Sequence, residues 1–465
     1  MKILMAASEV SPWVKTGGLA DVLCSLPPAL AALGLDVAVV LPRYRSISLD
    51  GAREVYGGLP VWVGSRSFPV DIYAVDRAGV TAFLVDCPAV FDRDVIYGHP
   101  DDHLRFGVLS KAVLGIARRL FRPRILHCHD WQTALVSGYL RHHLYGDPSF
   151  AGMKLLFTIH NLGYKGEFGA AVLADLGLAD LYYPDALEFF GNACLMKAGL
   201  LYSDWLTTVS PRYAMEIQTM EFGSGLEGVL RTRAANLTGI LNGADYDHWN
   251  PATDPAIAAN YSVNDVTGKQ ECKRDLIERM GLDSVSMERP LIGIVSRFAH
   301  QKGFDLIAEI AWALMNDHVS LVVLGSGEAS YENLFRALQA AYPGRIGLFV
   351  GHNEDLAHRI YAGSDLFLMP SRYEPCGLGQ IYSLRYGTLP VVRATGGLDD
   401  TIEEDSGFKF HGYSPWALLD AIRAATGAWW DGKRRERMIQ AAMNKDFSWS
   451  ASARHYVDLY HQLAG

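Results

Sequence analysis

Short apolar runs of strand length alternate with apolar-periodic stretches of helix length in the first half of the chain. The first run covers residues 2–7, and a glycine-containing loop, a predicted helix over 19–33 and a second run over 36–41 follow it. Four further runs complete this half, at 125–129, 154–159, 205–209 and 238–241. The alternation predicts a parallel sheet whose strands are joined by right-handed helical crossovers.

The same alternation starts afresh at residues 291–296, after a polar stretch with proline and asparagine over 242–290. It continues with apolar runs at 320–324, 346–350, 366–369 and 390–393. A single hydrophobic core stops growing near roughly 250–300 residues, so a chain of 465 residues favours two domains. We therefore expect an α/β protein of two doubly wound, Rossmann-like domains, over 1–241 and 242–449. Ligands of such sheets bind at the carboxyl ends of the strands, and two facing sheets imply a cleft between them.

Composition narrows the class of partner and the compartment. A net charge of −9 and a pI of about 5.9 offer no general attraction for nucleic acid, whose phosphates require clustered Lys and Arg. The six cysteines have no paired short spacing, which favours reduced thiols over a disulfide scaffold. The first apolar run is too short for a signal peptide or a spanning helix. We expect a cytoplasmic protein with neither a nucleic acid nor a membrane as partner.

A Thr-Gly-Gly sequence occurs twice, each time before a predicted helix. It lies within residues 15–21 (KTGGLAD) and again within 394–400 (ATGGLDD). At a helix start, Gly17 and Gly18 leave backbone N–H groups accessible to an anion, and Lys15 adds a full charge. A diphosphate is one ligand for such a loop. Independent use of glycine in two tight turns explains the repeat equally well.

Charged residues follow two predicted strands of the second half. Arg297 and Lys302 come after the run at 291–296, where they could neutralise a leaving diphosphate, although most such side chains lie in solvated loops. Glu374 opens the segment 374–380 (EPCGLGQ), and its carboxylate could bind sugar hydroxyls. Alternatively, Glu374 caps the following helix beside a structural thiol at Cys376.

Histidines end two predicted strands of the first half. His127 and His129 share one face of a strand, but a metal site would need a third ligand at a recognisable spacing, which is missing. His160 and Asn161 close the next strand, and with Asp130 they suit recognition of sugar hydroxyls. Buried, hydrogen-bonded histidines are the other interpretation.

Together these segments resemble, in order, the motifs of bacterial glycogen synthases and plant starch synthases. The resemblance runs from residue 2 to about residue 460 and rests on the ordered set KTGGLAD (15–21), HDW (129–131), TIHN (158–161), NG (242–243), SRF (296–298) with KG (302–303), EPCGL (374–378) and TGGL (395–398). It implies two facing Rossmann-like domains of the GT-B type with an interdomain catalytic cleft, and a helix over 450–465 that returns to the first domain. It further implies ADP-glucose as donor, the non-reducing end of an α-1,4-glucan (glycogen) as acceptor, retention of anomeric configuration, and no metal or other cofactor.

The resemblance also implies roles for individual residues. Catalysis is assigned to Glu374, Arg297, Lys302, His160 and Lys15. Substrate binding is assigned to Gly17, Gly18, Asp21, Tyr97, Asp130, Asn161, Asn242, His352, Cys376, Gly377, Leu378, Thr395 and Gly396. Two positions depart from the family pattern, because His352 stands where a tyrosine is frequent and Gly379 where a threonine is frequent. His352 can still stack on an adenine ring.

From these assignments we expect a mechanism in which fixed positive charge stabilises the leaving diphosphate. The acceptor hydroxyl attacks from the same face of the sugar and gives its proton to the departing phosphate. No protein nucleophile is needed. The alternatives are a transferase that uses UDP-glucose or another acceptor, a glucan phosphorylase, which would need a pyridoxal cofactor and a longer chain, and a non-catalytic glucan-binding protein of the same fold.

Overall fold

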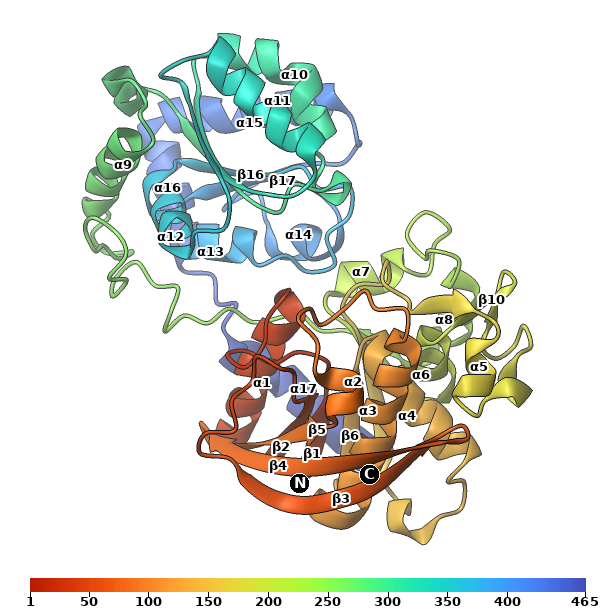
Figure 1. The fold of residues 1–465 in the computed structure, drawn as a ribbon. Helices are drawn as coiled ribbons and strands as arrows, with labels where there is room; N and C mark the ends of the chain where they lie inside the picture. Colours follow the sequence, from red (N-terminus) through yellow and green to blue (C-terminus); the bar gives the residue numbers. More distant parts are fainter. The chain divides into compact units, whose positions relative to one another are not determined.

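The computed structural model describes all residues from 1 to 465, and the chain divides into two compact units (Figure 1). Unit 1 comprises Met1–Val209, Ala214–Gly243 and Trp449–Gly465. Unit 2 comprises Ser210–Tyr213 and Ala244–Ser448. Each unit is an α/β structure built on a sheet whose strands are all or mostly parallel, as the alternation of apolar runs predicts.

The sheet of unit 1 has nine strands in the order β12-β11-β7-β6-β1-β2-β5-β4-β3. Its parallel part contains the runs predicted from the sequence, namely β1 (Lys2–Ala6), β2 (Asp36–Pro42), β6 (Ile125–His129), β7 (Lys154–Ile159), β11 (Trp205–Thr208) and β12 (Leu237–Gly239). Strand β1 lies between β2 and β6, so the chain builds outward from β1 first on one side and then on the other. Ligands bind beside such a reversal of strand order.

One edge of this sheet was not predicted. Strands β3 (Arg53–Val63), β4 (Arg66–Arg77) and β5 (Val80–Asp86) form an antiparallel meander, and β5 joins it to β2 in parallel. Buried and exposed positions alternate along the end of β3, and buried and partly exposed positions alternate along the middle of β4, because one face of this edge meets solvent. A separate small sheet contains β8 (Glu167–Gly169), β10 (Asn192–Cys194) and β9 (Glu188–Phe189).

The longer helices of unit 1 form two groups. In the first, α1 (Gly18–Ala32) packs against α17 (Trp449–Ala464), the last helix of the chain. Two hydrogen bonds fasten α17 to the rest of unit 1: Ser452 Oγ donates to the carbonyl of Leu241, just after β12, at 2.6 Å, and Tyr460 Oη lies 2.8 Å from Nδ1 of His127 in β6. The second group comprises α3 (Asp102–Ile116), α4 (Trp131–His142) and α6 (Met196–Tyr202). Shorter helices are α2 (Pro88–Phe91), α5 (Val172–Asp175), α7 (Pro211–Glu216) and α8 (Glu227–Thr232).

The sheet of unit 2 is wholly parallel, in the order β15-β14-β13-β16-β17-β18. Its strands are β13 (Leu291–Val295), β14 (Ser320–Gly325), β15 (Ile346–Val350), β16 (Leu366–Met369), β17 (Leu389–Arg393) and β18 (Phe408–Phe410). Successive side chains belong to different cores: Leu321 and Val323 lie in one hydrophobic cluster, and Val322 and Leu324 in the other. Burial on both faces explains why these strands read as continuous apolar runs.

Helices cover both faces of this sheet (Figure 1). They are α9 (Gly268–Arg279), α10 (Phe304–Asn316), α11 (Ala329–Ala341), α12 (Glu354–Gly363), α13 (Gly379–Arg385), α14 (Gly396–Thr401), α15 (Pro415–Trp430) and α16 (Gly432–Met443). Strand order reverses between β13 and β16, which places the ends of these two strands at the ligand-binding position of the fold. None of the helices in either unit is both long and apolar enough to span a bilayer.

Candidate active site

A pocket opens in unit 2 where the strand order reverses. Its walls are the ends of β13 and β16, together with the loops that follow them. Five of the residues predicted from the sequence or its family resemblance line this one pocket: Arg297, Lys302, Glu374, Gly377 and Leu378. Gly379, the first residue of α13, lines it as well. The strand-end rule and the motifs therefore lead to the same place.

Two of the lining residues form a short ion pair. Lys302 Nζ donates to Glu374 Oε2 at 2.6 Å, and the two side chains are only 17% and 8% exposed. Ser371 Oγ also donates to Glu374 Oε2, at 3.1 Å. Oε1 takes part in neither contact. The carboxylate thus has one oxygen held by the protein and one with acceptor capacity for a ligand hydroxyl.

Tight backbone packing holds Lys302 and Glu374 in position. The loop after β13 ends at Gly303, whose φ is 75°, and a Cβ there would lie 2.0 Å from the carbonyl oxygen of Pro370. The amide of Arg372 donates to the carbonyl of Gln301 at 2.8 Å, and the Gln301 side chain donates to the carbonyl of Tyr373 at 3.1 Å. The two loops are therefore fixed to one another, with little freedom for the ion pair to separate.

The second Thr-Gly-Gly segment supports the Glu374 loop from behind. Gly397 N donates to the carbonyl oxygens of Glu374 and Pro375 at 3.1 and 3.2 Å. A Cβ on Gly396 would lie 1.9 Å from the Glu374 carbonyl oxygen, and one on Gly397 would lie 2.1 Å from that of Cys376. Glycine is required here because two backbone segments touch. Thr395 is buried next to them, and neither it nor Gly396 is among the pocket-lining residues.

Two other predicted residues of unit 2 lie away from the pocket wall. Cys376 is buried and forms no disulfide, and its carbonyl accepts a hydrogen bond from the Gln380 side chain at 3.0 Å. His352 is exposed in the loop after β15 and does not line the pocket. The roles of these residues, and those of Thr395 and Gly396, remain predictions.

The first Thr-Gly-Gly segment, in unit 1, is organised by a carboxylate that the sequence interpretation overlooked. Glu9 is 4% exposed and follows β1; its side chain accepts from the amide of Thr16 at 2.5 Å, from the amide of Gly17 at 3.2 Å and from the Thr16 hydroxyl at 3.0 Å. The sequence interpretation left the Gly17 amide accessible to a phosphate. In the structure this amide instead donates a hydrogen bond to Glu9, because the buried carboxylate needs hydrogen-bond donors.

The remaining residues of this segment are accessible. Gly18 begins α1, and a Cβ on Gly17 or Gly18 would meet no atom within 4 Å. Lys15 Nζ lies 2.7 Å from Oδ1 of Asp21 in the first turn of α1, with side chains 53% and 34% exposed. The predicted cation and carboxylate are therefore paired near the surface of unit 1.

Tyr97 is a further hydrogen-bond partner of Glu9. Its hydroxyl donates to Glu9 Oε1 at 3.0 Å and lies 2.7 Å from Ser8 Oγ. Burial is the main cause that raises the pKa of Tyr97 well above the usual value, and the nearby Glu9 charge adds to it. The phenol therefore stays protonated and able to donate.

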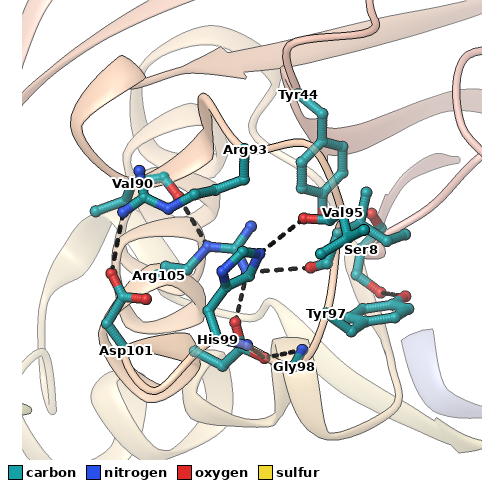
Figure 2. A network of polar contacts seen from close by, with 12 residues as sticks. Ser8, Tyr44, Val90, Arg93, Val95, Tyr97, Gly98, His99, Asp101 and Arg105 are labelled. Carbon is teal, nitrogen blue, oxygen red and sulfur yellow. Dashed lines mark hydrogen bonds and ion pairs between the residues drawn. The ribbon is translucent and has the colours of Figure 1, made fainter.

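A fully buried arginine holds the segment that carries Tyr97 (Figure 2). Arg105 donates to the carbonyls of Val90 at 2.7 Å and Ile96 at 3.1 Å, and it also contacts Asp102. Asp102 Oδ2 in turn accepts from the amides of Gly98 and His99 at 2.8 and 3.2 Å. The loop is thus pinned from inside at both ends, and Tyr97 is directed at Ser8 (Figure 2).

The two histidines of β6 and His160, which directly follows β7, form a polar chain. His127 has Tyr460 on Nδ1 at 2.8 Å and Thr158 on Nε2 at 2.6 Å, so both of its nitrogens have partners and the metal interpretation receives no support. His129 Nδ1 lies 2.9 Å from Nε2 of His160. Burial lowers the pKa of His127 and of His160 to about 3, so both rings are neutral at physiological pH.

Asp130, His160 and Asn161 come together where β6 and β7 end. Asp130 has a positive φ of 56°, and its Oδ1 accepts from the amide of His160 at 2.8 Å. Burial raises the pKa of Asp130 to about 7, against the opposing effect of these backbone donors. The Asn161 side chain accepts from the amide of Gly163 at 2.9 Å, which shapes its own turn. Asn242 lies elsewhere in unit 1, after β12, with a buried Oδ1 that has no hydrogen-bond partner.

Two residues that matter most for positioning carried no recognisable signal. Glu9 and Arg105 match no motif, and their contacts reach across the sequence to Tyr97 and to the segment 90–96. One rule pointed toward Glu9, since it lies three residues beyond β1 at the carboxyl edge of the sheet. Nothing in the sequence pointed to Arg105, because a buried arginine is rare and is recognised only by its partners.

Comparison with protein families gives two matches that together cover most of the chain. Residues 2–232 match the family described as "Starch synthase catalytic domain", and residues 283–445 match "Glycosyl transferases group 1". Among individual relatives, the chain is 47% identical over 478 residues to a glycogen synthase of Koribacter versatilis, covering 99% of this chain and 98% of the relative. It is 46% identical over 477 residues to a glycogen synthase of Myxococcus xanthus, covering 100% and 99%.

Solved structures agree. The catalytic domain of starch synthase IV from Arabidopsis thaliana, bound to ADP and acarbose, is 33% identical and superposes with a TM-score of 0.90 over 100% of this chain and 99% of that one. A sucrose-phosphate synthase from Thermosynechococcus elongatus is 17% identical with a TM-score of 0.62, covering 99% and 98%, and shares the fold. The predicted α/β fold of two Rossmann-like domains, of the GT-B type, is confirmed. The chain is a glycosyltransferase and belongs to the glycogen synthase family.

Proposed function

We propose that this protein transfers glucose from ADP-glucose to the non-reducing end of an α-1,4-glucan, with retention of the anomeric configuration. The observation that carries the proposal is the pocket in which Arg297, Lys302 and Glu374 meet at the reversal of strand order. The ADP and acarbose bound to starch synthase IV support the choice of nucleotide and of glucan.

The pocket offers partners for both parts of a nucleotide sugar, the diphosphate and the glucosyl unit. The exposed Arg297 and the largely buried Lys302 supply positive charge for the diphosphate, and water screens the charge of Lys302 less. Glu374 Oε1 accepts from a glucose hydroxyl, while Ser371 and Lys302 hold the other oxygen. The backbone around Gly377 and Leu378 contacts the glucosyl unit.

We assign the residues of unit 1 to the same reaction. Lys15 and Gly18 act on the diphosphate, Asp21 and Asp130 lie beside the reacting sugar or its acceptor, and His160 and Asn161 bind glucose hydroxyls. Asn242 contributes a buried amide oxygen with unused acceptor capacity. Tyr97, and His352 in unit 2, contact substrate as aromatic side chains.

The chemical step follows from these assignments. The bond between the glucose anomeric carbon and the diphosphate oxygen breaks, and the negative charge that develops on the diphosphate is stabilised by Arg297 and Lys302. The acceptor hydroxyl attacks the same face that the diphosphate leaves, and its proton passes to the departing phosphate oxygen. The products are ADP and a glucan longer by one α-1,4-linked glucose.

The test measures glucose incorporation into glycogen from ADP-glucose and from UDP-glucose in parallel, with the anomeric configuration of the new linkage read by NMR. We expect transfer with an α product and a preference for ADP-glucose. Faster transfer from UDP-glucose would contradict the donor assignment, and glucan binding without transfer would contradict the enzymatic one. Arg423→Gln, which removes an exposed ion pair with Asp317, is the matched control and should leave the rate unchanged.

A further inference from the structure

We propose that unit 2 contains a zinc-type divalent metal site formed by His248, Glu354 and His358. One ligand atom from each residue lies within 4.8 Å of the others. Two imidazoles and one carboxylate are the donors of a three-ligand zinc site that leaves a fourth position to water. None of the three lines the pocket around Glu374, so the site is distinct from the proposed catalytic one.

Helix α12 supplies two of the ligands. Glu354 and His358 are four residues apart near its start, and this spacing places both side chains on the same helix face. The Asn353 side chain caps the helix by accepting from the amide of Leu356 at 2.9 Å. Both ligands therefore stand on a rigid element whose first turn is fixed.

The third ligand comes from the segment before α9. Asp245 Oδ1 accepts from the amides of Asp247 and His248 at 3.0 and 3.2 Å, which forms a turn that presents His248 to α12. His248 Nε2 lies 2.8 Å from Oε1 of Glu354. A cation would replace this hydrogen bond by coordinating both atoms.

A buried carboxylate prepares His358 as a metal ligand. His358 is 3% exposed, and its Nδ1 lies 2.7 Å from Oδ2 of Asp254, which is itself 2% exposed. Because a carboxylate only accepts, it holds the hydrogen on Nδ1 and leaves Nε2 as the nitrogen with a lone pair for a metal. Carboxylate–histidine–metal arrangements of this kind fix the tautomer and orientation of the ligand and strengthen metal binding by roughly 10- to 100-fold.

Stacking fixes the orientation of the same ring. Trp249 lies parallel to His358 with ring centroids 3.8 Å apart and planes 5° apart, and its indole also stacks on Tyr382 at 4.3 Å. Tyr386 donates its hydroxyl to the same oxygen of Asp254. The buried ligand is therefore preorganised.

The two other ligands lie at the surface, where a cation can reach them. The side chains of His248 and Glu354 are 53% and 54% exposed. Tetrahedral zinc with bonds of about 2.0–2.1 Å needs ligand atoms about 3.4 Å apart, so small side-chain rotations suffice. The donor set selects a transition metal over Mg²⁺ and Ca²⁺, which prefer six or more oxygen ligands. A bound ion would fasten the segment just after Gly243, where the chain enters unit 2, to α12.

The experiment titrates the chelator-treated full-length protein with Zn²⁺ by calorimetry, and with Co²⁺ by visible absorption as a geometry-sensitive probe. We expect one Zn²⁺ per chain, a Co²⁺ spectrum of tetrahedral intensity, a Zn²⁺-dependent rise of the melting temperature, and no comparable binding of Mg²⁺ or Ca²⁺. His248→Ala and Glu354→Gln alter only exposed side chains, and each should weaken Zn²⁺ binding at least tenfold and abolish the melting shift.

The control is His455→Ala, which removes an exposed histidine of α17 in unit 1 and should leave Zn²⁺ binding unchanged. Failure of the parent protein to bind Zn²⁺ at 100-fold excess would overturn the proposal. Equal Zn²⁺ affinity in the parent and both ligand variants would overturn it too, because the ion would then sit at another site. The outcome is independent of the proposed transferase activity, since neither substituted ligand is assigned to that reaction.

Discussion

Removing the partners of the Lys302–Glu374 pair separately and together distinguishes a catalytic role from a structural one. Lys302→Met leaves the Glu374 carboxylate buried, with the Ser371 hydroxyl still donating to it. Glu374→Gln leaves the Lys302 ammonium, 17% exposed, without its countercharge. The double variant leaves neither charge.

The structure sets the expected magnitudes. Breaking a fully buried pair costs about 3–5 kcal/mol, and replacing both charges by neutral groups is frequently near neutral. Because Lys302 is partly exposed and Ser371 still donates, we expect each single change to lower the free energy of unfolding by about 1–3 kcal/mol. The double variant should lose less than the sum of the two. Transfer from ADP-glucose should fall at least about 100-fold in all three, since each lacks a group that acts on the donor.

Urea unfolding followed by tryptophan fluorescence gives the stabilities, and glucose incorporation into glycogen gives the rates. The decisive pattern is a double variant that regains stability relative to the single variants and regains no activity. Strictly additive stability losses would refute the buried-pair reasoning. Activity within tenfold of the parent in a folded Lys302→Met or Glu374→Gln protein would refute the assignment of these residues to catalysis.

Two further changes test the organisation of unit 1. Glu9→Gln removes the charge that accepts hydrogen bonds from the amides of Thr16 and Gly17 and from the Tyr97 hydroxyl. We expect a loss of about 1–3 kcal/mol in unfolding free energy and a raised KM for ADP-glucose. Unchanged stability and KM would contradict this role. Asp130→Asn tests a raised pKa: the native carboxyl group, with a pKa of about 7, lowers stability as pH rises from about 4 through 7, because its charged form is buried. The variant should therefore be more stable than the parent at pH 8, by at most about 4 kcal/mol, since a change of one pKa unit corresponds to about 1.4 kcal/mol. This advantage should disappear near pH 4. Parallel pH profiles of stability for the two proteins would contradict the raised pKa of Asp130.

The parallel strands could be predicted because burial on both faces gives each one a continuous apolar run. Strands β3 and β4 could not, since one of their faces meets solvent and polar residues interrupt their pattern. Their pairing depends on turns at Gly64 and at Ala78–Gly79, where φ is positive, and such turns are weak signals in a sequence with 45 glycines.

Some residues of the candidate site could likewise be predicted from the sequence, and the functions of others could not. Arg297, Lys302 and Glu374 could be located because each follows a strand that the sequence marks clearly, and the strand-end rule then brings them together. The functions of Gly396 and Gly397 in the structure could not be inferred, because glycine before a helix suits an anion site and a backbone contact equally well. Only the short distances to the Glu374 and Cys376 carbonyls distinguish these uses.

The two lysines among the three cations assigned to the diphosphate are held in different electrostatic environments. Lys15 pairs with Asp21 near the surface, where salt and water weaken the interaction of charges. Lys302 pairs with Glu374 in a pocket that screens it little, and its loop is fixed by the contact between Gly303 and Pro370. An ammonium that is already oriented and desolvated needs less reorganisation when charge develops on a leaving group. The larger share of leaving-group stabilisation should therefore come from Lys302, with the exposed Lys15 contributing more to binding the donor than to the chemical step.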